Sequence, residues 1–205
     1  MSISKVNKKN IVFELAAPFY GLFYNHQKKH YIKALNKIKS QTDFFSYKSI
    51  IDIGCGTGAL CSVLNKNGFE VTGIDLVQRM LNTAMGKKEN KSINFIKADI
   101  LKKLPFRDKN FDVCISSYVA HGLNANQRKV MYKEMNRITR HLIIFHDYNQ
   151  SRSFFTNIIE WLEGGDYFNF IGSVRSEMKE SFSEVKELNI DIRASWYVCK
   201  PKDYN

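Results

Sequence analysis

The chain has 205 residues, of which 44% are hydrophobic and 25% charged, as in a soluble globular domain with one full-sized core. No apolar run approaches the roughly 18–20 residues of a membrane span, and the N-terminal segment lacks an apolar signal region, so we expect a cytoplasmic protein. The net charge is +11, and residues 1–48 carry nine lysines against two acidic residues. The four cysteines form no Cys-x-x-Cys pair, which favours buried free thiols over a zinc site or a disulfide scaffold.

In chain order, an aromatic-rich and then basic segment comes first. It spans residues 10–48, and we expect it to form a helical cap or a simple packing helix. Strand-like and helix-like segments then alternate. The strands are expected at 49–54, 69–75, 93–99, 111–117 and 141–147, and the helices at 58–67, 76–86 and 125–139. Such alternation predicts parallel βαβ units in a doubly wound α/β sheet.

The last quarter of the chain departs from this rhythm. A helix is expected over 153–165, followed by a looser aromatic stretch over 166–174. Residues 182–199 hold two strand-like runs joined by the short link NIDI, which predicts an antiparallel hairpin. We therefore expect one domain over 1–205, with a cap (1–48), a cofactor-binding core (49–147), an insertion forming the acceptor pocket (148–181) and a C-terminal hairpin (182–205).

A glycine-rich turn closes the first strand. The glycines of IIDIGCGTG let the backbone turn sharply and let a ligand approach closely. Their spacing, G-x-G-x-G, is one residue shorter than the dinucleotide fingerprint G-x-G-x-x-G. Asp52 stands two residues before the first glycine, where it would repel a pyrophosphate and suits a cationic ligand.

Two further acidic residues end the next strands. Asp75 lies 21 residues after Gly54, where a carboxylate can accept hydrogen bonds from both ribose hydroxyls. Asp99 ends the third strand, where it can meet an adenine amino group beside Ile100. A strand-end aspartate alone is more often a turn former, but two in succession after this loop favour a ligand.

These motifs together resemble the class I S-adenosylmethionine-dependent methyltransferases, in the broad branch that includes the ubiquinone-biosynthesis methyltransferases. The resemblance covers residues 49–123 through IIDIGCGTG, VTGIDLV, FIKADILKKLPF and FDVCISSYVAHGL. It implies a Rossmann-like doubly wound sheet of seven strands, mostly parallel with an antiparallel last strand, and S-adenosylmethionine as the cofactor. No metal is expected, because the sequence has no ligand cluster with convincing spacing. By motif position the cofactor site would comprise Asp52, Gly54, Cys55, Gly56, Thr57, Gly58, Asp75, Leu76, Asp99, Ile100 and Ser116.

The acceptor side is less well defined. His121 follows the fourth strand and is the candidate general base, with a loop-capping role as the alternative. In this family, members that methylate exocyclic amines of bases or of glutamine often carry an Asn/Asp-Pro-Pro-aromatic motif where this chain has Ser116-Ser117-Tyr118-Val119, so that chemistry is disfavoured. The candidate acceptor contacts are Tyr20, Tyr24, Tyr118, His146 and Tyr167, each with a packing role as the alternative.

Several functions stay open at this point. The first is methylation of a small molecule, and the second is methylation of RNA or protein through the basic N-terminal segment. A cofactor-binding protein without turnover is a third possibility. A nicotinamide-dependent oxidoreductase is disfavoured by the glycine spacing and by Asp52.

Overall fold

The computed structural model describes residues 3–149, 167–191 and 194–202, with side chains described over 21–149, 169–191 and 194–202. The chain divides into two compact units, residues 1–99 and 100–205, called here the N-terminal and C-terminal units. Seven strands form one sheet in the order β3-β2-β1-β4-β5-β7-β6. Within the units, β1, β2 and β3 pair in parallel, as do β4 and β5, whereas β7 is antiparallel to β5 and β6. The predicted fold class is thereby confirmed.

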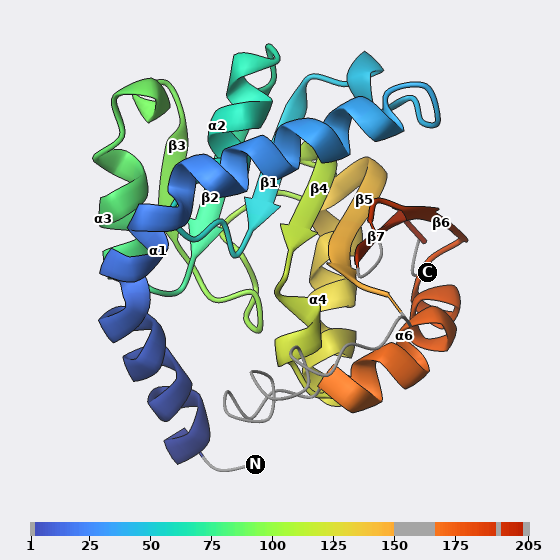
Figure 1. Cartoon of the computed structure of the whole chain (residues 1–205). Coiled ribbons are helices and arrows are strands. Elements are labelled where there is room, and N and C mark those ends of the chain that lie inside the picture. Colours follow the sequence, from blue (N-terminus) through green and yellow to red (C-terminus); the bar gives the residue numbers. More distant parts are fainter. Residues whose placement is uncertain (1–2, 150–166, 192–193, 203–205) are drawn as a thin grey trace. The chain divides into compact units, whose positions relative to one another are not determined.

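In the N-terminal unit, a long helix packs on two shorter ones that accompany a parallel three-stranded edge (Figure 1). Its elements are α1 (Ile3–Ile38), η1 (Phe44–Ser46), β1 (Ser49–Ile53), α2 (Ala59–Lys66), β2 (Glu70–Asp75), α3 (Gln78–Met85), η2 (Lys88–Asn90) and β3 (Asn94–Lys97). β1 is buried almost throughout, and the first six residues of α2 are all buried. These apolar runs fix β1 between its neighbours and hold the turn that joins β1 to α2.

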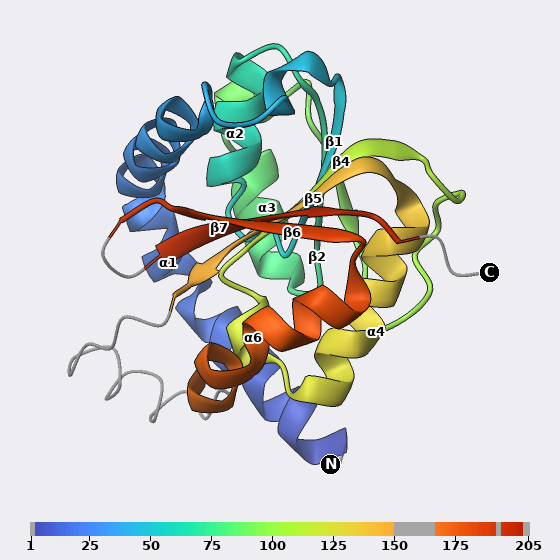
Figure 2. The ribbon, with the colours of Figure 1, turned by 90° about the vertical axis from the view of Figure 1, so that its right-hand side faces the viewer.

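In the C-terminal unit, two helices contact each other and lie on the same face of the strands (Figure 2). Its elements are β4 (Phe111–Ser117), η3 (Ala120–Gly122), α4 (Ala125–Ile138), β5 (Thr139–Tyr148), α6 (Tyr167–Ser181), β6 (Glu184–Asn189) and β7 (Ala194–Lys200). α4 begins with a capping box, in which Asn124 and Gln127 each accept a hydrogen bond from the other's backbone N–H.

The aromatic stretch after residue 166 differs from expectation. We predicted a loose segment over 166–174, but residues 167–181 form the helix α6. Phe170, Val174 and Met178 are fully buried at a spacing of four residues, so this segment has a helical apolar stripe that its glycine and aromatic content concealed. The helix predicted over 153–165 lies outside the described residues.

The structure bears on other broad expectations too. None of the helices in the described part of the chain is both long and apolar enough to cross a bilayer. The four cysteines are free and buried. The predicted organisation of the chain as one domain with a cap, a core, an insertion and a hairpin stays a prediction.

Candidate functional site

The turn after β1 has the geometry of a ligand cradle. Gly54, Gly56 and Gly58 all have positive φ angles, of 72°, 52° and 76°. The backbone N–H groups of Gly54 and Cys55 both donate to the carbonyl oxygen of Ile74, at 2.8 and 2.9 Å, which ties the turn to β2. A Cβ atom on Gly56 would meet nothing within 4 Å, whereas one on Gly58 would lie 3.0 Å from three neighbouring side chains. Glycine is therefore required at 56 by backbone conformation alone, and at 58 by backbone conformation and packing together.

Asp52 lies buried in the strand that leads into this turn. Its side chain is 1% exposed, and its Oδ2 accepts a hydrogen bond from the Cys61 thiol of α2 at 3.2 Å. Its Oδ1 has no hydrogen-bond partner among the described residues. Burial raises the pKa of Asp52 to about 7, a rise opposed by the Cys61 hydrogen bond and increased by the charge of Asp75. A buried carboxyl with an unsatisfied oxygen beside a glycine turn fits a cationic ligand.

Asp75 ends β2 and already holds the turn in place. Its Oδ2 accepts from the backbone N–H of Gly56 and its Oδ1 from that of Val77, both at 2.8 Å. Each carboxylate oxygen can accept more than one hydrogen bond, so these contacts leave capacity for ribose hydroxyls. Asp75 therefore orders the loop, whether or not it also binds a ligand.

The other predicted cofactor residues differ in burial. Thr57 is buried and its hydroxyl donates to Gln27 of α1 at 3.5 Å. Leu76 and Asp99 in the N-terminal unit are partly exposed, as is Ile100 in the C-terminal unit. Ser116 is buried within β4, opposite Phe145 of β5. The roles predicted for these residues remain predictions.

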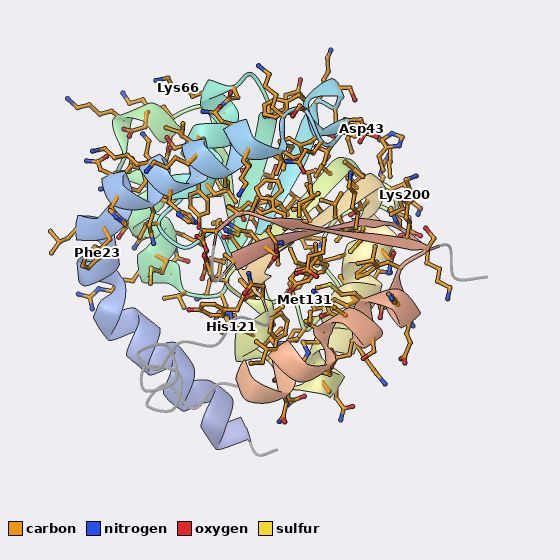
Figure 3. All side chains as sticks on the ribbon, turned by 45° about the vertical axis from the view of Figure 1, so that its right-hand side comes forward. Phe23, Asp43, Lys66, His121, Met131 and Lys200 are labelled. Carbon is orange, nitrogen blue, oxygen red and sulfur yellow. The ribbon has the colours of Figure 1, made fainter. Side chains whose placement is uncertain are left out.

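In the C-terminal unit, His121 forms a buried pair with an aspartate. The Nδ1 atom of His121 lies 2.8 Å from Oδ1 of Asp147, which is 1% exposed at the end of β5. The same carboxylate accepts from the backbone N–H groups of Tyr148 (2.9 Å) and His121 (3.4 Å). Because a carboxylate accepts, Nδ1 carries the proton and Nε2 is the basic nitrogen. Figure 3 shows where His121 lies in this unit.

Aromatic rings surround this pair. The centroid of the His121 ring lies 4.8 Å from that of Tyr148, 6.4 Å from that of Tyr118 and 6.5 Å from that of Phe170. Tyr118 also contacts Tyr148, at 5.3 Å. Tyr118 has a φ of 56°, a left-handed conformation that is strained for a tyrosine. β4, η3, β5 and α6 thus bring four rings together, and we call His121, Tyr118, Tyr148 and Phe170 the aromatic cluster.

The remaining acceptor candidates have varied surroundings. His146 is fully buried, with its Nδ1 3.4 Å from the Ser117 hydroxyl and its ring 4.9 Å from that of Tyr118. Tyr24 is 3% exposed, and its hydroxyl donates to Asn90 at 3.3 Å. Tyr20 and Tyr167 lie outside the residues whose side chains are described. Acceptor contact by any of these four residues stays a prediction.

Sequence reasoning missed two interactions of these sites. It assigned no partner to His121, whereas the structure pairs His121 with Asp147. It also left Cys61 without a role, although Cys61 donates to Asp52. No local spacing in the sequence indicated the first pairing. The second could have been suggested, because Asp52 lies near the end of β1 and Cys61 lies in the first turn of α2, on the other side of the glycine turn. Over the described residues, no three His, Cys, Asp or Glu side chains are grouped as a metal site would need.

Comparison with known proteins agrees with this geometry. The family model described as a methyltransferase domain matches residues 51–142. A ubiquinone biosynthesis O-methyltransferase of Rickettsia bellii is 34% identical over 106 residues, covering 51% of this chain and 43% of that protein. Its Rickettsia prowazekii counterpart is 26% identical over 208 residues, covering 88% and 81%. This chain therefore matches less than half the length of the first of these relatives.

Solved structures share the fold. A proposed S-adenosyl-L-methionine-dependent methyltransferase of Methanococcus maripaludis has a TM-score of 0.70 and 18% sequence identity, with 94% of each chain covered. At that identity the likeness establishes the architecture alone. It agrees with the strand order and the single antiparallel strand β7 described above.

Proposed function

This chain belongs to the class I S-adenosylmethionine-dependent methyltransferases, and we propose that it transfers a methyl group from S-adenosylmethionine to a hydroxyl group of a small aromatic acceptor. The His121–Asp147 pair beside three aromatic rings carries the proposal. The name of the Rickettsia relatives, which are O-methyltransferases, agrees with it. A cytoplasmic location is part of the proposal and is supported by the four free, buried thiols.

The residues of the N-terminal unit fit this cofactor. Asp52 offers a buried carboxyl oxygen to its ammonium group, and the open space beside Gly56 lets the cofactor approach the turn. Asp75 would accept from the ribose hydroxyls and Asp99 from the adenine amino group. Bound S-adenosylmethionine would supply a methyl group already activated by the sulfonium. What the chain must add is alignment, exclusion of water and, for a protonated acceptor, a base.

His121 is that base in our proposal. A hydroxyl acceptor keeps its proton at neutral pH, so its oxygen becomes a good nucleophile only as a base removes that proton. The Asp147 carboxylate orients the imidazole and stabilises the positive charge that His121 acquires on taking the proton. An unprotonated amine would need no such pair, which is why the observation favours oxygen.

The aromatic cluster supports a flat acceptor. The rings of Tyr118 and Tyr148, which contact each other, offer faces and edges against which another ring can pack. Tyr118 and Tyr148 are partly exposed, so part of this surface is accessible. Tyr118 has a strained, left-handed backbone, and such strained residues cluster at active sites and ligand-binding sites.

Calorimetry and turnover test the proposal. We expect S-adenosylhomocysteine to bind and NAD not to bind. With labelled S-adenosylmethionine, a dihydroxybenzene should accept methyl, while the matched aniline and cyclohexanol should accept much less. Binding of NAD alone would mean that the glycine turn was misread, and binding without any turnover would favour a cofactor-binding protein.

His121→Ala tests the base. We expect kcat to fall by ~10²–10⁴, the usual contribution of a general base, with S-adenosylhomocysteine affinity unchanged. His141→Ala is the matched control, because His141 is an exposed histidine on the same strand as Asp147. Unchanged kcat in His121→Ala would refute the base role and leave the loop-capping alternative.

A further inference from the structure

The contact between Asp52 and Cys61 has no place in the mechanism above. Cys61 Sγ lies 3.2 Å from Asp52 Oδ2, and both side chains are buried at 0–1% exposure. The second oxygen, Oδ1, has no hydrogen-bond partner among the described residues. A thiol is a weak donor, and here it donates to a buried carboxylate and so stabilises the charged form of Asp52.

Burial and the nearby charge of Asp75 disfavour the carboxylate form of Asp52, whereas the hydrogen bond from Cys61 favours it. Asp75 at the end of β2 adds a second negative charge, which raises the pKa of Asp52. Cys55 in the turn is a buried thiol that contacts Cys61. Burial, with the neighbouring Cys55 and Asp52, raises the pKa of Cys61 well above its usual value. Cys61 therefore keeps its proton and stays a hydrogen-bond donor, which favours the carboxylate form of Asp52.

We infer that Cys61 is a positioning residue that keeps Asp52 ionised for the ammonium group of the cofactor. Cofactor affinity should therefore fall when Asp52 takes up a proton. The inference rests on the proposed function, because S-adenosylmethionine is the ligand that brings the ammonium group. A protonated Asp52 would still fill its place in β1, but it would lose its attraction for a cation. Removal of the thiol should shift the protonation of Asp52 without changing the fold of the turn.

Calorimetric titration with S-adenosylhomocysteine between pH 5.5 and 8.5 tests this. In the native protein, affinity should fall as the pH drops through about 7, the pKa of Asp52. Loss of one hydrogen bond in Cys61→Ala should move that midpoint up by ~0.5–1 pH unit and so weaken binding ~2–5-fold at pH 7. Cys61→Ser, which keeps a donor, should restore the native midpoint. The ligand's own amine titrates identically for every variant and cancels in the comparison.

A second measurement needs no ligand. The carboxyl carbon signal of Asp52, in protein labelled with ¹³C-aspartate and assigned by its loss in Asp52→Asn, reports the midpoint directly by NMR. Cys199→Ala is the control, because it removes a fully buried thiol from β7 in the other unit. We expect an upward shift in Cys61→Ala and none in Cys199→Ala or Cys61→Ser.

The outcomes separate the two proposals. Equal ¹³C midpoints in the native protein and Cys61→Ala would overturn the role of Cys61. A shifted midpoint together with pH-independent S-adenosylhomocysteine affinity would overturn the link from Asp52 to the cofactor. Failure of S-adenosylhomocysteine to bind at any pH would overturn the proposed function and the cofactor part of this inference, while the ¹³C midpoints would still decide whether Cys61 controls Asp52.

Discussion

The buried Asp52 carboxyl makes the stability of the fold depend on pH. Its pKa is raised, so the folded state binds a proton more tightly than the unfolded chain does. The stability that comes from this proton is complete below about pH 4 and is lost as the pH rises through about 7. Above about pH 7 the folded chain holds a buried negative charge, which lowers its stability. In our proposal the ammonium group of the cofactor compensates for this charge.

Asp52→Asn should therefore stabilise the free protein at high pH. The shift from 3.8 to about 7 sets a ceiling of roughly 4 kcal/mol, and we expect ~1–3 kcal/mol at pH 8 with little change at pH 4. Denaturant unfolding at the two pH values measures this difference. The same variant should lose most of its affinity for S-adenosylhomocysteine. A stability gain equal at both pH values would show that Asp52 is not the titrating group.

Where β1 joins α2, the turn depends on two different uses of glycine. Gly58→Ala adds a Cβ 3.0 Å from Ala84, Asn90 and Phe95, at a left-handed φ of 76°. We expect the free energy of unfolding to fall by ~2–4 kcal/mol. The left-handed backbone costs an alanine about 1–2 kcal/mol, and displacement of the packed neighbours adds to this cost. Gly68→Ala is the control, since its φ is 90° but a Cβ there would meet nothing within 4 Å. Equal losses in chemical denaturation would remove the packing argument.

Between α4 and α6, a buried ion pair joins two helices near the aromatic cluster. Arg128 is fully buried and donates to both carboxylate oxygens of Glu177, at 2.6 and 2.7 Å. Its guanidinium also donates to the Leu123 carbonyl and lies 5.6 Å from the centroid of the Phe170 ring. Burial raises the pKa of Glu177, but the hydrogen bonds from Arg128 and Ser173 outweigh it, and the net pKa is lowered.

Glu177→Gln should destabilise the protein by ~3 kcal/mol, because it leaves a buried guanidinium without its counter-charge. Arg140→Gln breaks the exposed pair with Asp112 and should cost less than ~1 kcal/mol. Because the pKa of Glu177 is lowered, the pair stabilises the fold above about pH 4.5 and less as the pH falls below it. Thermal unfolding of both variants at pH 7 and pH 4 gives the comparison, and a Glu177→Gln cost that did not shrink at pH 4 would contradict the ion-pair account.

Over the whole chain, local patterns predicted the regular part of the fold and missed the contacts between distant segments. The strands from β1 to β5 lie within two residues of their predicted ends, because apolar runs closed by glycine or aspartate are local signals. The pairing of His121 with Asp147 joins residues 26 apart and depends on how β4 and β5 align, which no local pattern encodes. Phe170 was visible as an aromatic residue, but its place beside His121 depends on α6 being a helix.

The positive charge of the chain is concentrated in residues 1–48. Three of the nine lysines in residues 1–48 lie within the first ten residues, before the aromatic part of α1. An RNA acceptor would be held by phosphate contacts and would lose affinity steeply with salt, whereas a small aromatic acceptor needs only the cluster around His121.

Deletion of residues 1–10 should therefore leave methyl transfer to the small acceptor within about twofold, since each lost phosphate contact matters only for a polyanion. Turnover measured at 50 and 200 mM salt, with RNA binding followed in parallel, checks this. Loss of RNA binding and of all activity together in the truncated chain would overturn the small-molecule proposal in favour of an RNA substrate.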